Sequence, residues 1–201
     1  IPIIFVIIIK GSIIFNLFLL ICFFTILYEW HKICKMKNIY FMGIIFLIFS
    51  FYTIYMLYNF NNSYLNFLYV LIICISTDIG GYVFGKIFKG PKLTSISPKK
   101  TYSGAIGGYV FTIIFIYIFF NQTFFFSEIK DIFFTTYIMA IAISSVSQIG
   151  DILISYFKRL SKIKDTGNII PGHGGLLDRA DGIIFAFPFS YVFLLLNFKF
   201  F

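Results

Sequence analysis

Charged residues are scarce in this chain. Only 12% of its 201 residues are Asp, Glu, Lys or Arg, whereas 60% are hydrophobic, and the mean hydropathy is +0.95. Because a soluble domain carries about 25% charged residues, this composition excludes an ordinary water-soluble fold. Several apolar runs reach about 17 residues or more, enough to cross the ~30 Å hydrocarbon core of a bilayer as a helix. The sequence therefore predicts an integral membrane protein.

Cysteine and histidine are also few. The chain has 3 cysteines and 2 histidines. Cys22, Cys34 and Cys74 lack the spacing of a metal site or a redox pair, so we expect them to be packing residues. No His or Cys cluster is present that would favour zinc.

Six apolar segments alternate with short polar loops. We predict membrane-spanning helices over residues 13–28, 39–58, 65–85, 104–121, 132–157 and 182–200. The first, third and fifth intervening loops hold every loop cation except Lys130. Short loops rich in Lys and Arg stay on the cytoplasmic side. The predicted fold class is therefore all-α, a polytopic transmembrane helical bundle of about six spans with cytoplasmic active-site loops.

No internal repeat or linker divides the chain, so residues 1–201 are predicted to form a single integral-membrane domain. The chain opens on Ile1 inside an apolar stretch too short to span, and we expect it to be truncated at the N-terminus. A signal-peptide remnant is disfavoured because no small-residue cleavage site follows. The net charge of +8 is explained by topology and anionic lipid headgroups rather than by nucleic acid.

Acidic residues are the rarest charged group, with 8 in the chain. Asp78 and Asp151 each precede a cationic loop by about two helical turns, which places them ~10 Å below the cytosolic edge. An ionised Asp inside a span costs about 2.5–3.5 kcal/mol or more, so such a residue usually faces a polar cavity. A structural pair with Lys or Arg is the alternative. Glu29, Glu128 and Asp131 are expected to be ordinary loop or interface residues.

Asp178 and Asp181 stand three residues apart at the start of the last predicted span. On a helix they would share a face and repel each other unless a cation or proton lay between them. With Asp151 nearby they would form an all-oxygen site of the kind that Mg²⁺ prefers beside substrate phosphates. A pair of solvated acids at a helix N-terminus is the simpler interpretation of Asp178 and Asp181 alone.

Two cationic, glycine-containing loops lie on the same predicted side. In the first, Lys99 and Lys100 precede a helix whose N-terminal glycines suit either anion binding or close helix packing. In the second, Pro-Gly-His-Gly-Gly at residues 171–175 predicts a tight turn with an anion-binding nest. His173 could shuttle a proton, donate to a phosphate or hold the turn. Together with the acids, these loops suit attack by a lipid-borne oxygen on a nucleotide phosphorus.

The second loop also carries a family resemblance. Residues 155–181 read Ser-Tyr-Phe-Lys-Arg-x4-Lys-Asp-Thr-Gly-x3-Pro-Gly-His-Gly-Gly-Leu-Leu-Asp-Arg-Ala-Asp and closely resemble the signature of CDP-diacylglycerol synthases (phosphatidate cytidylyltransferases). The segments beginning at Asp78 (Asp-Ile-Gly-Gly-Tyr), at Ser97 (Ser-Pro-Lys-Lys-Thr) and at Ser147 (Ser-Gln-Ile-Gly-Asp) are similar to the family in its order. The resemblance covers roughly residues 70–195.

The resemblance implies transfer of a cytidylyl group from CTP to phosphatidic acid, giving CDP-diacylglycerol and pyrophosphate for phospholipid biosynthesis. It implies Mg²⁺, with K⁺ as a candidate companion, at a metal centre of Asp151, Asp178 and Asp181, with His173 as a further catalytic residue. The candidates for binding substrate phosphates are Lys99, Lys100, Lys158, Arg159, Lys164 and Arg179. The supporting residues are Asp78, Asp165, Gly174 and Gly175. The expected location is a bacterial inner membrane with the active site on its cytoplasmic side, and a homodimer is left open.

Two positions depart from the family pattern. Ala180 stands where the family usually has a larger apolar residue or Thr, and Ser103 where an acid is common; neither is a proposed ligand.

One alternative function is a CTP-dependent lipid-alcohol kinase. A CDP-alcohol phosphotransferase is disfavoured because no Asp or Glu follows Asp181. An ion-coupled transporter using Asp78 and Asp151 would leave the Gly-rich loop unexplained and lacks an inverted repeat.

Overall fold

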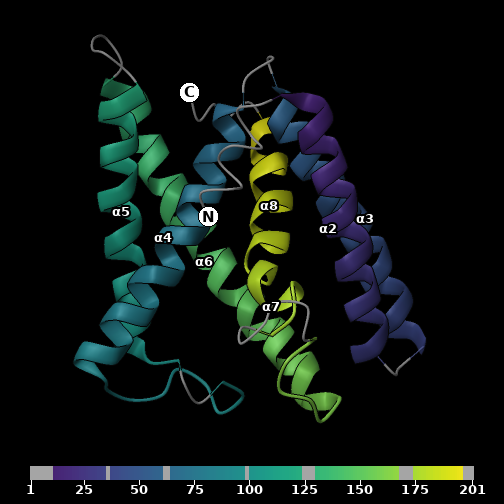
Figure 1. Cartoon of the computed structure of the whole chain (residues 1–201). Helices are drawn as coiled ribbons and strands as arrows, with labels where there is room; N and C mark the ends of the chain where they lie inside the picture. The colour runs from purple at the N-terminus through teal and green to yellow at the C-terminus, as the bar shows by residue number, and fades with distance from the viewer. Residues whose placement is uncertain are drawn as a thin grey trace.

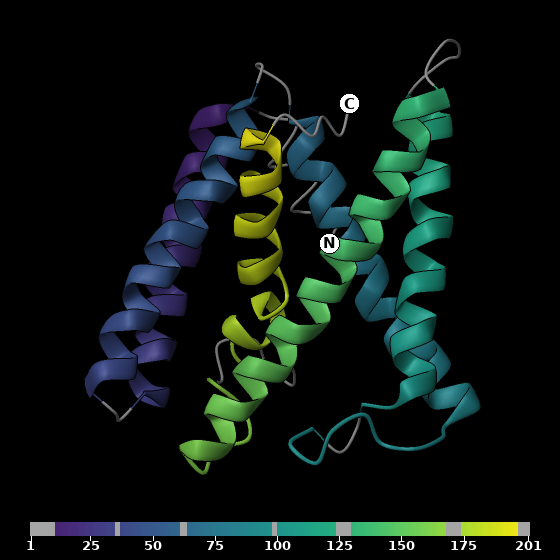
Figure 2. The same cartoon turned by 180° about the vertical axis from the view of Figure 1, so that it is seen from behind.

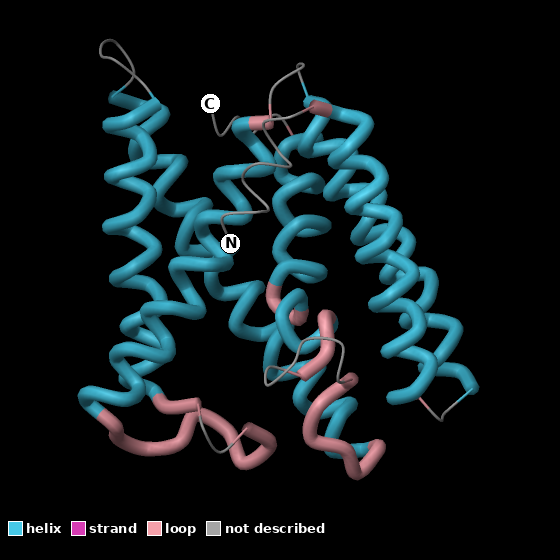
Figure 3. Tube along the Cα trace, in the orientation of Figure 1, coloured by secondary structure: helices cyan, strands magenta, loops and turns pink. Residues whose placement is uncertain are grey.

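The computed structural model describes residues 11–34, 37–60, 64–97, 100–123, 130–167 and 174–196. Within these ranges the chain forms helices and no β-strand (Figure 3). The helices are α2 (Ser12–Ile33), α3 (Lys37–Asn59), α4 (Leu65–Phe88), α5 (Tyr102–Thr123), α6 (Lys130–Leu160), α7 (Leu177–Ala180) and α8 (Ile183–Leu195). The predicted all-α class is confirmed.

Within the described ranges, five helices are long and apolar enough to cross a membrane, namely Ile13–Ile33, Ile39–Asn59, Leu65–Phe88, Tyr102–Phe119 and Phe134–Leu160. They correspond to the first five predicted spans. The last predicted span, 182–200, begins as α8, which has 13 residues and contains Pro188. Residues 197–200 lie outside the part that the structure describes. The short α7 precedes α8 and brings the acidic motif to the end of the bundle.

The helices form one bundle, with α2 and α3 together on one side and α4 with α5 on the other (Figure 1). Between them, α8 packs against α3 and α6. α6 has 31 residues, about 46 Å of helix, which exceeds the hydrocarbon thickness. It crosses the bundle obliquely (Figure 2), so its last turns reach the polar end.

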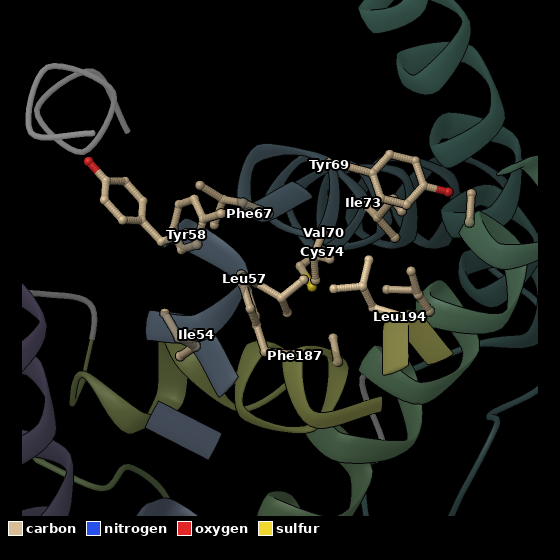
Figure 4. Packing of buried hydrophobic residues seen from close by; sticks show 14 of the residues in the cluster. Ile54, Leu57, Tyr58, Phe67, Tyr69, Val70, Ile73, Cys74, Phe187 and Leu194 are labelled. Atoms are coloured by element: carbon tan, nitrogen blue, oxygen red, sulfur yellow. The ribbon is translucent and has the colours of Figure 1, made fainter. Parts of the chain in front are cut away.

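Two apolar clusters hold these helices together. The first is centred on α3, α4, α6 and α8 and includes one buried residue each from α2 and α5; Figure 4 shows part of it, including Tyr69, Cys74 and Phe187. The second joins α2 to α3, α6, α7 and α8 around Trp30 and Leu177. Cys74 is a buried free thiol inside the first cluster, as expected for a packing residue.

Helices α4 and α5 pack closely through glycine. A Cβ atom added to Gly80 would lie 2.3 Å from the Gly107 carbonyl oxygen, and one added to Gly104 would lie 2.8 Å from that of Gly81. Small residues allow helix backbones to approach in this way inside a membrane. The packing interpretation of the glycines that begin α5 is therefore correct for Gly104 and Gly107.

Hydroxyl groups add polar contacts between the spans. The Thr77 hydroxyl of α4 lies 3.0 Å from that of Thr112 on α5 and 2.7 Å from that of Ser144 on α6. All three residues are buried. Since buried polar groups are costly without a partner, these bonds favour one relative placement of the three helices, which sets the positions of the site residues beyond them.

Candidate functional site

The loop between α4 and α5 and the loop between α6 and α7 lie at the same end of the bundle (Figure 3). The α5 helix begins beside the first loop, where the Gly104 N–H donates to the Thr101 hydroxyl at 3.1 Å, a side-chain cap. The segment just before this cap carries Lys100. The two cationic loops predicted to share a side of the membrane therefore do share an end of the molecule.

A cavity of about 160 Å³ opens between the polar ends of α4, α5 and α6. Asp78 lines it from α4, Asp151 lines it from α6, and Lys100 lines it from the loop before α5. The Lys100 ammonium forms an ion pair with the Asp151 carboxylate. Three residues predicted from distant motifs are thus brought to one polar cavity.

Asp181, at the turn between α7 and α8, is buried against Asp151. It is 8% exposed, and its carboxyl group lies close enough to that of Asp151 for the two to interact directly. Burial raises the pKa of Asp181, and the neighbouring Asp151 carboxylate raises it further. Asp78 also lies close enough to repel both of these carboxylates. Acids from α4, α6 and the α7–α8 turn therefore form one electrostatically coupled group.

Glycine allows this approach of α8 to α6. A Cβ atom on Gly182 would lie 2.2 Å from the Ser147 hydroxyl oxygen, and one on Gly150 would lie 2.9 Å from the Asp181 carbonyl oxygen. Each glycine is adjacent to one member of the Asp151–Asp181 pair. The close packing of the helices is what holds the two carboxyl groups in contact.

The Asp151–Asp181 pair suits a hard cation. Two carboxyl groups in contact need a proton or a cation between them, and carboxylate oxygens are the ligands that Mg²⁺ prefers. Among the residues that the structure describes, no three His, Cys, Asp or Glu side chains are grouped closely enough to hold a metal ion. A Mg²⁺ ion on this pair would take its remaining ligands from water and substrate phosphates, as it commonly does. The Asp151–Asp181 pair therefore fits a Mg²⁺ ion that takes its other ligands from water and substrate.

Asp178 has different partners. Its Oδ1 atom lies 2.7 Å from the Lys158 ammonium, and its Oδ2 atom accepts hydrogen bonds from the Thr166 N–H at 2.8 Å and the Gly175 N–H at 3.0 Å. Burial favours a raised pKa, but these three donors outweigh it and hold the pKa of Asp178 below its ordinary value. The carboxylate is ionised at neutral pH and joins the end of α6 to the Gly-rich loop. Its role as a metal ligand stays a prediction.

The two glycines predicted as supporting residues have a steric reason in this loop. Gly174 has φ +83°, and a Cβ atom there would lie 2.8 Å from Asp178 Oδ2. A Cβ atom on Gly175 would lie 2.0 Å from the Thr166 hydroxyl oxygen. Only a residue without a side chain lets the loop come this close to Asp178 and Thr166.

The prediction that Glu29 is an ordinary loop or interface residue is wrong. Glu29 is 1% exposed and accepts hydrogen bonds from the Thr166 hydroxyl at 2.9 Å and from the N–H groups of Leu176 and Leu177 at 2.9 and 2.7 Å. The prediction failed because it ended the first span at residue 28, whereas α2 continues to Ile33. The available signal was the cost of a carboxylate inside a span, the argument that identified Asp78 and Asp151.

The other predicted residues are spread around this end. Lys164 and Asp165 are exposed. Arg159 is also exposed, donates to the Ile163 carbonyl at 3.3 Å, and lines a second hollow of about 440 Å³ with Tyr156 and Ser95. Arg179 is exposed and close enough to act on Asp78. Outside the described residues lie Lys99, His173 and Glu128.

This structure defines a membrane-embedded helical protein with clustered acids and cations at one polar end, an arrangement suited to an enzyme acting on charged substrates at the bilayer surface. Residues 38–197 match the model of the cytidylyltransferase family. The chain belongs to that family.

The proteins to which the chain is similar in sequence carry names from the same family. The chain is 38% identical to the phosphatidate cytidylyltransferase of Rickettsia bellii over 172 residues, which cover 81% of this chain and 72% of that protein. It is 37% identical to the phosphatidate cytidylyltransferase of Bacillus subtilis over 129 residues, 64% of this chain and 46% of that protein. For the Haemophilus influenzae protein of the same name the identity is 38% over 130 residues, 63% and 44% of the two chains. The matched part is thus less than half of the latter two relatives.

Proposed function

We propose that this chain transfers a cytidylyl group from CTP to phosphatidic acid. A phosphate oxygen of phosphatidic acid attacks the α-phosphorus of CTP, a new P–O–P linkage forms, and the bond from the α-phosphorus to the β-phosphate oxygen breaks. The products are CDP-diacylglycerol and pyrophosphate. The observation that carries the proposal is the group of Asp78, Asp151 and Asp181 beside Lys100 at the polar end of a cytidylyltransferase-family chain.

The residues of this end suit a reaction that depends on charge neutralisation. The attacking phosphate is already anionic near neutral pH, because a phosphate monoester has its second pKa near 6, so little base catalysis is needed. Lys100 forms an ion pair with Asp151, and Lys158 forms one with Asp178. Each is a flexible point charge that can turn from its carboxylate to a substrate phosphate. Arg159, Lys164 and Arg179 are exposed and add positive charge at the same end.

We also propose that Asp151 and Asp181 hold a Mg²⁺ ion, with Asp178 as a further ligand and K⁺ as a candidate companion. When bound, Mg²⁺ would bridge phosphate oxygens and neutralise developing charge. For Asp178 to take part, its Oδ1 atom must leave the Lys158 ammonium. That exchange would release Lys158 for a phosphate. We place this end of the molecule on the cytoplasmic side of a bacterial inner membrane, where CTP is available.

The test is mass spectrometry of the products that the purified protein forms from CTP, Mg²⁺ and phosphatidic acid. We expect CDP-diacylglycerol and pyrophosphate, with a rate lower by about 10²–10³ in Asp151→Asn, as for loss of one electrostatic stabiliser. Asp131→Asn is the matched control, because it lies 20 residues away at the start of α6, about 30 Å along the helix.

Other products would identify the alternatives. A phosphorylated lipid alcohol with release of CDP would indicate a CTP-dependent kinase. Solute uptake into proteoliposomes without any nucleotide, together with no lipid product, would indicate an ion-coupled transporter. Unchanged product formation in Asp151→Asn would contradict the assigned site.

A further inference from the structure

Glu29 contacts the Gly-rich loop although it lies far from it in sequence. The Glu29 side chain comes from α2, before residues 38–197 that match the family, and its hydrogen-bond partners are 137 to 148 residues further along the chain. Its neighbours Trp30 and Ile33 belong to the second apolar cluster. The carboxylate therefore projects from the packed C-terminal end of α2.

The Thr166 hydroxyl connects Glu29 to Asp178. Its oxygen lies 2.9 Å from Glu29 Oε2 and 3.0 Å from Asp178 Oδ2, and Thr166 is 3% exposed. A hydroxyl has one proton to donate, so these two acceptors share it. The position of each carboxylate therefore depends on the other through Thr166.

Glu29 also binds the end of the same loop that leads into α7. The N–H groups of Leu176 and Leu177, which begin the segment carrying Asp178, both donate to it, and Leu177 is fully buried. One carboxylate thus joins Thr166, before the Pro-Gly-His sequence, to Leu176 and Leu177 after it. A buried acid is costly unless it is fully hydrogen-bonded. These three donors offset that cost only while the loop keeps this arrangement.

We propose that Glu29 is a positioning residue for the cytidylyl-transfer site. Through Thr166, and through the N–H groups of Leu176 and Leu177, it orients the Asp178 carboxylate toward Lys158. It touches neither the proposed ion nor the substrates and acts by holding a residue that does. The inference rests on the proposed function and extends the catalytic machinery to α2.

The experiment compares Glu29→Gln, Thr166→Val and the double variant with wild type in the purified protein. The kcat, the KM for CTP and the Mg²⁺ concentration at half-maximal rate are measured per folded enzyme, with folding checked by size exclusion and thermal unfolding. We expect each single variant to lower kcat about tenfold and to raise the Mg²⁺ requirement, as for loss of an outer partner of a ligating residue. The double variant should lose less than the product of the two single losses, because both single variants remove the hydrogen bond between Glu29 and Thr166.

Two further variants separate positioning from general damage. Thr166→Ser keeps the hydroxyl and should restore the wild-type constants. Thr25→Val removes a hydroxyl from α2 whose hydrogen bond lies within its own helix, to the Ile21 carbonyl, and should change nothing. Hydrogen exchange of the Thr166 and Gly175 amides, which donate to Asp178, should be faster in Glu29→Gln and Thr166→Val than in wild type.

The inference is overturned if the variants lower only the unfolding temperature and leave kcat, KM and Mg²⁺ dependence of the folded enzyme unchanged. Losses that multiply in the double variant would also overturn it. If the wild type forms no CDP-diacylglycerol, the proposed function fails instead. The exchange measurement then decides the positioning role: unchanged Thr166 and Gly175 amides exclude it, and faster exchange supports it.

Discussion

Lys158 illustrates how the fold can give a residue a partner that its sequence motif does not indicate. It lies in the last turn of α6 and is 9% exposed, so it is less available to solvent than a typical phosphate-binding lysine. Its ammonium is held by Asp178 at 2.7 Å. Two charges are desolvated together here, and neither is tolerated well without the other.

Removing one partner of this pair should therefore destabilise the protein. We expect Lys158→Met to lower the free energy of unfolding by about 3 kcal/mol, because it leaves the partly buried Asp178 charge without its cation. In the double variant Lys158→Met with Asp178→Asn the loss should be smaller than the sum of the two single losses. The measurement is unfolding in mixed micelles, with Lys158→Arg as the charge-conserving control. Strict additivity would show that the two side chains are not coupled.

At the scale of the helices, glycine packing controls where the cations lie. α5 begins beside Lys100, and its approach to α4 through Gly80, Gly104 and Gly107 brings that lysine over the cavity. On α6, the length of 31 residues carries Asp151 and Lys158 to the same end. The site is thus assembled by helix packing rather than within any one motif.

A bulkier residue in the α4–α5 contact should separate these helices. In Gly107→Ala the new methyl group would meet Phe84 Cβ at 2.3 Å and the Gly80 carbonyl oxygen at 2.7 Å, and overpacking of this kind costs about 1–3 kcal/mol. We expect a lower thermal unfolding temperature in detergent. Gly81→Ala is the control, since its methyl group would lie at an ordinary 3.7 Å from the Gly104 carbonyl oxygen. Equal temperatures for both variants would contradict this account of the contact.

At the scale of the whole molecule, positive charge is concentrated at one end of the helical bundle. The loops after α4 and after α6 carry Lys92, Lys100, Lys162 and Lys164 and lie at one end, opposite Tyr64 at the start of α4 (Figures 1 and 3). Such an asymmetry orients short loops toward the cytoplasm during insertion. This asymmetry supports the proposal that the site faces the cytoplasm.

Cysteine labelling can test this orientation. In a chain with Cys22, Cys34 and Cys74 replaced by alanine, Lys162→Cys and Tyr64→Cys introduce thiols at exposed positions of opposite ends. We expect a membrane-impermeant maleimide to modify residue 162 in inside-out vesicles and residue 64 in right-side-out vesicles. The reverse pattern would exclude a cytoplasmic site.

The sequence by itself determined the helical membrane class, the positions of five spans and the motifs that become the site. Hydropathy over about 20 residues is a local property, because the bilayer imposes its thickness on each segment separately. The resemblance of residues 155–181 to cytidylyltransferases is equally local, and the family match confirmed it.

Only the tertiary structure decided which charged groups meet. Asp181 lies against Asp151, Asp178 takes Lys158, and Glu29 reaches a loop 137 residues away. These partners depend on how closely glycine lets α6 and α8 approach and on how far α2 extends. Charge pairing between distant segments follows from packing geometry, and no spacing within one segment records it.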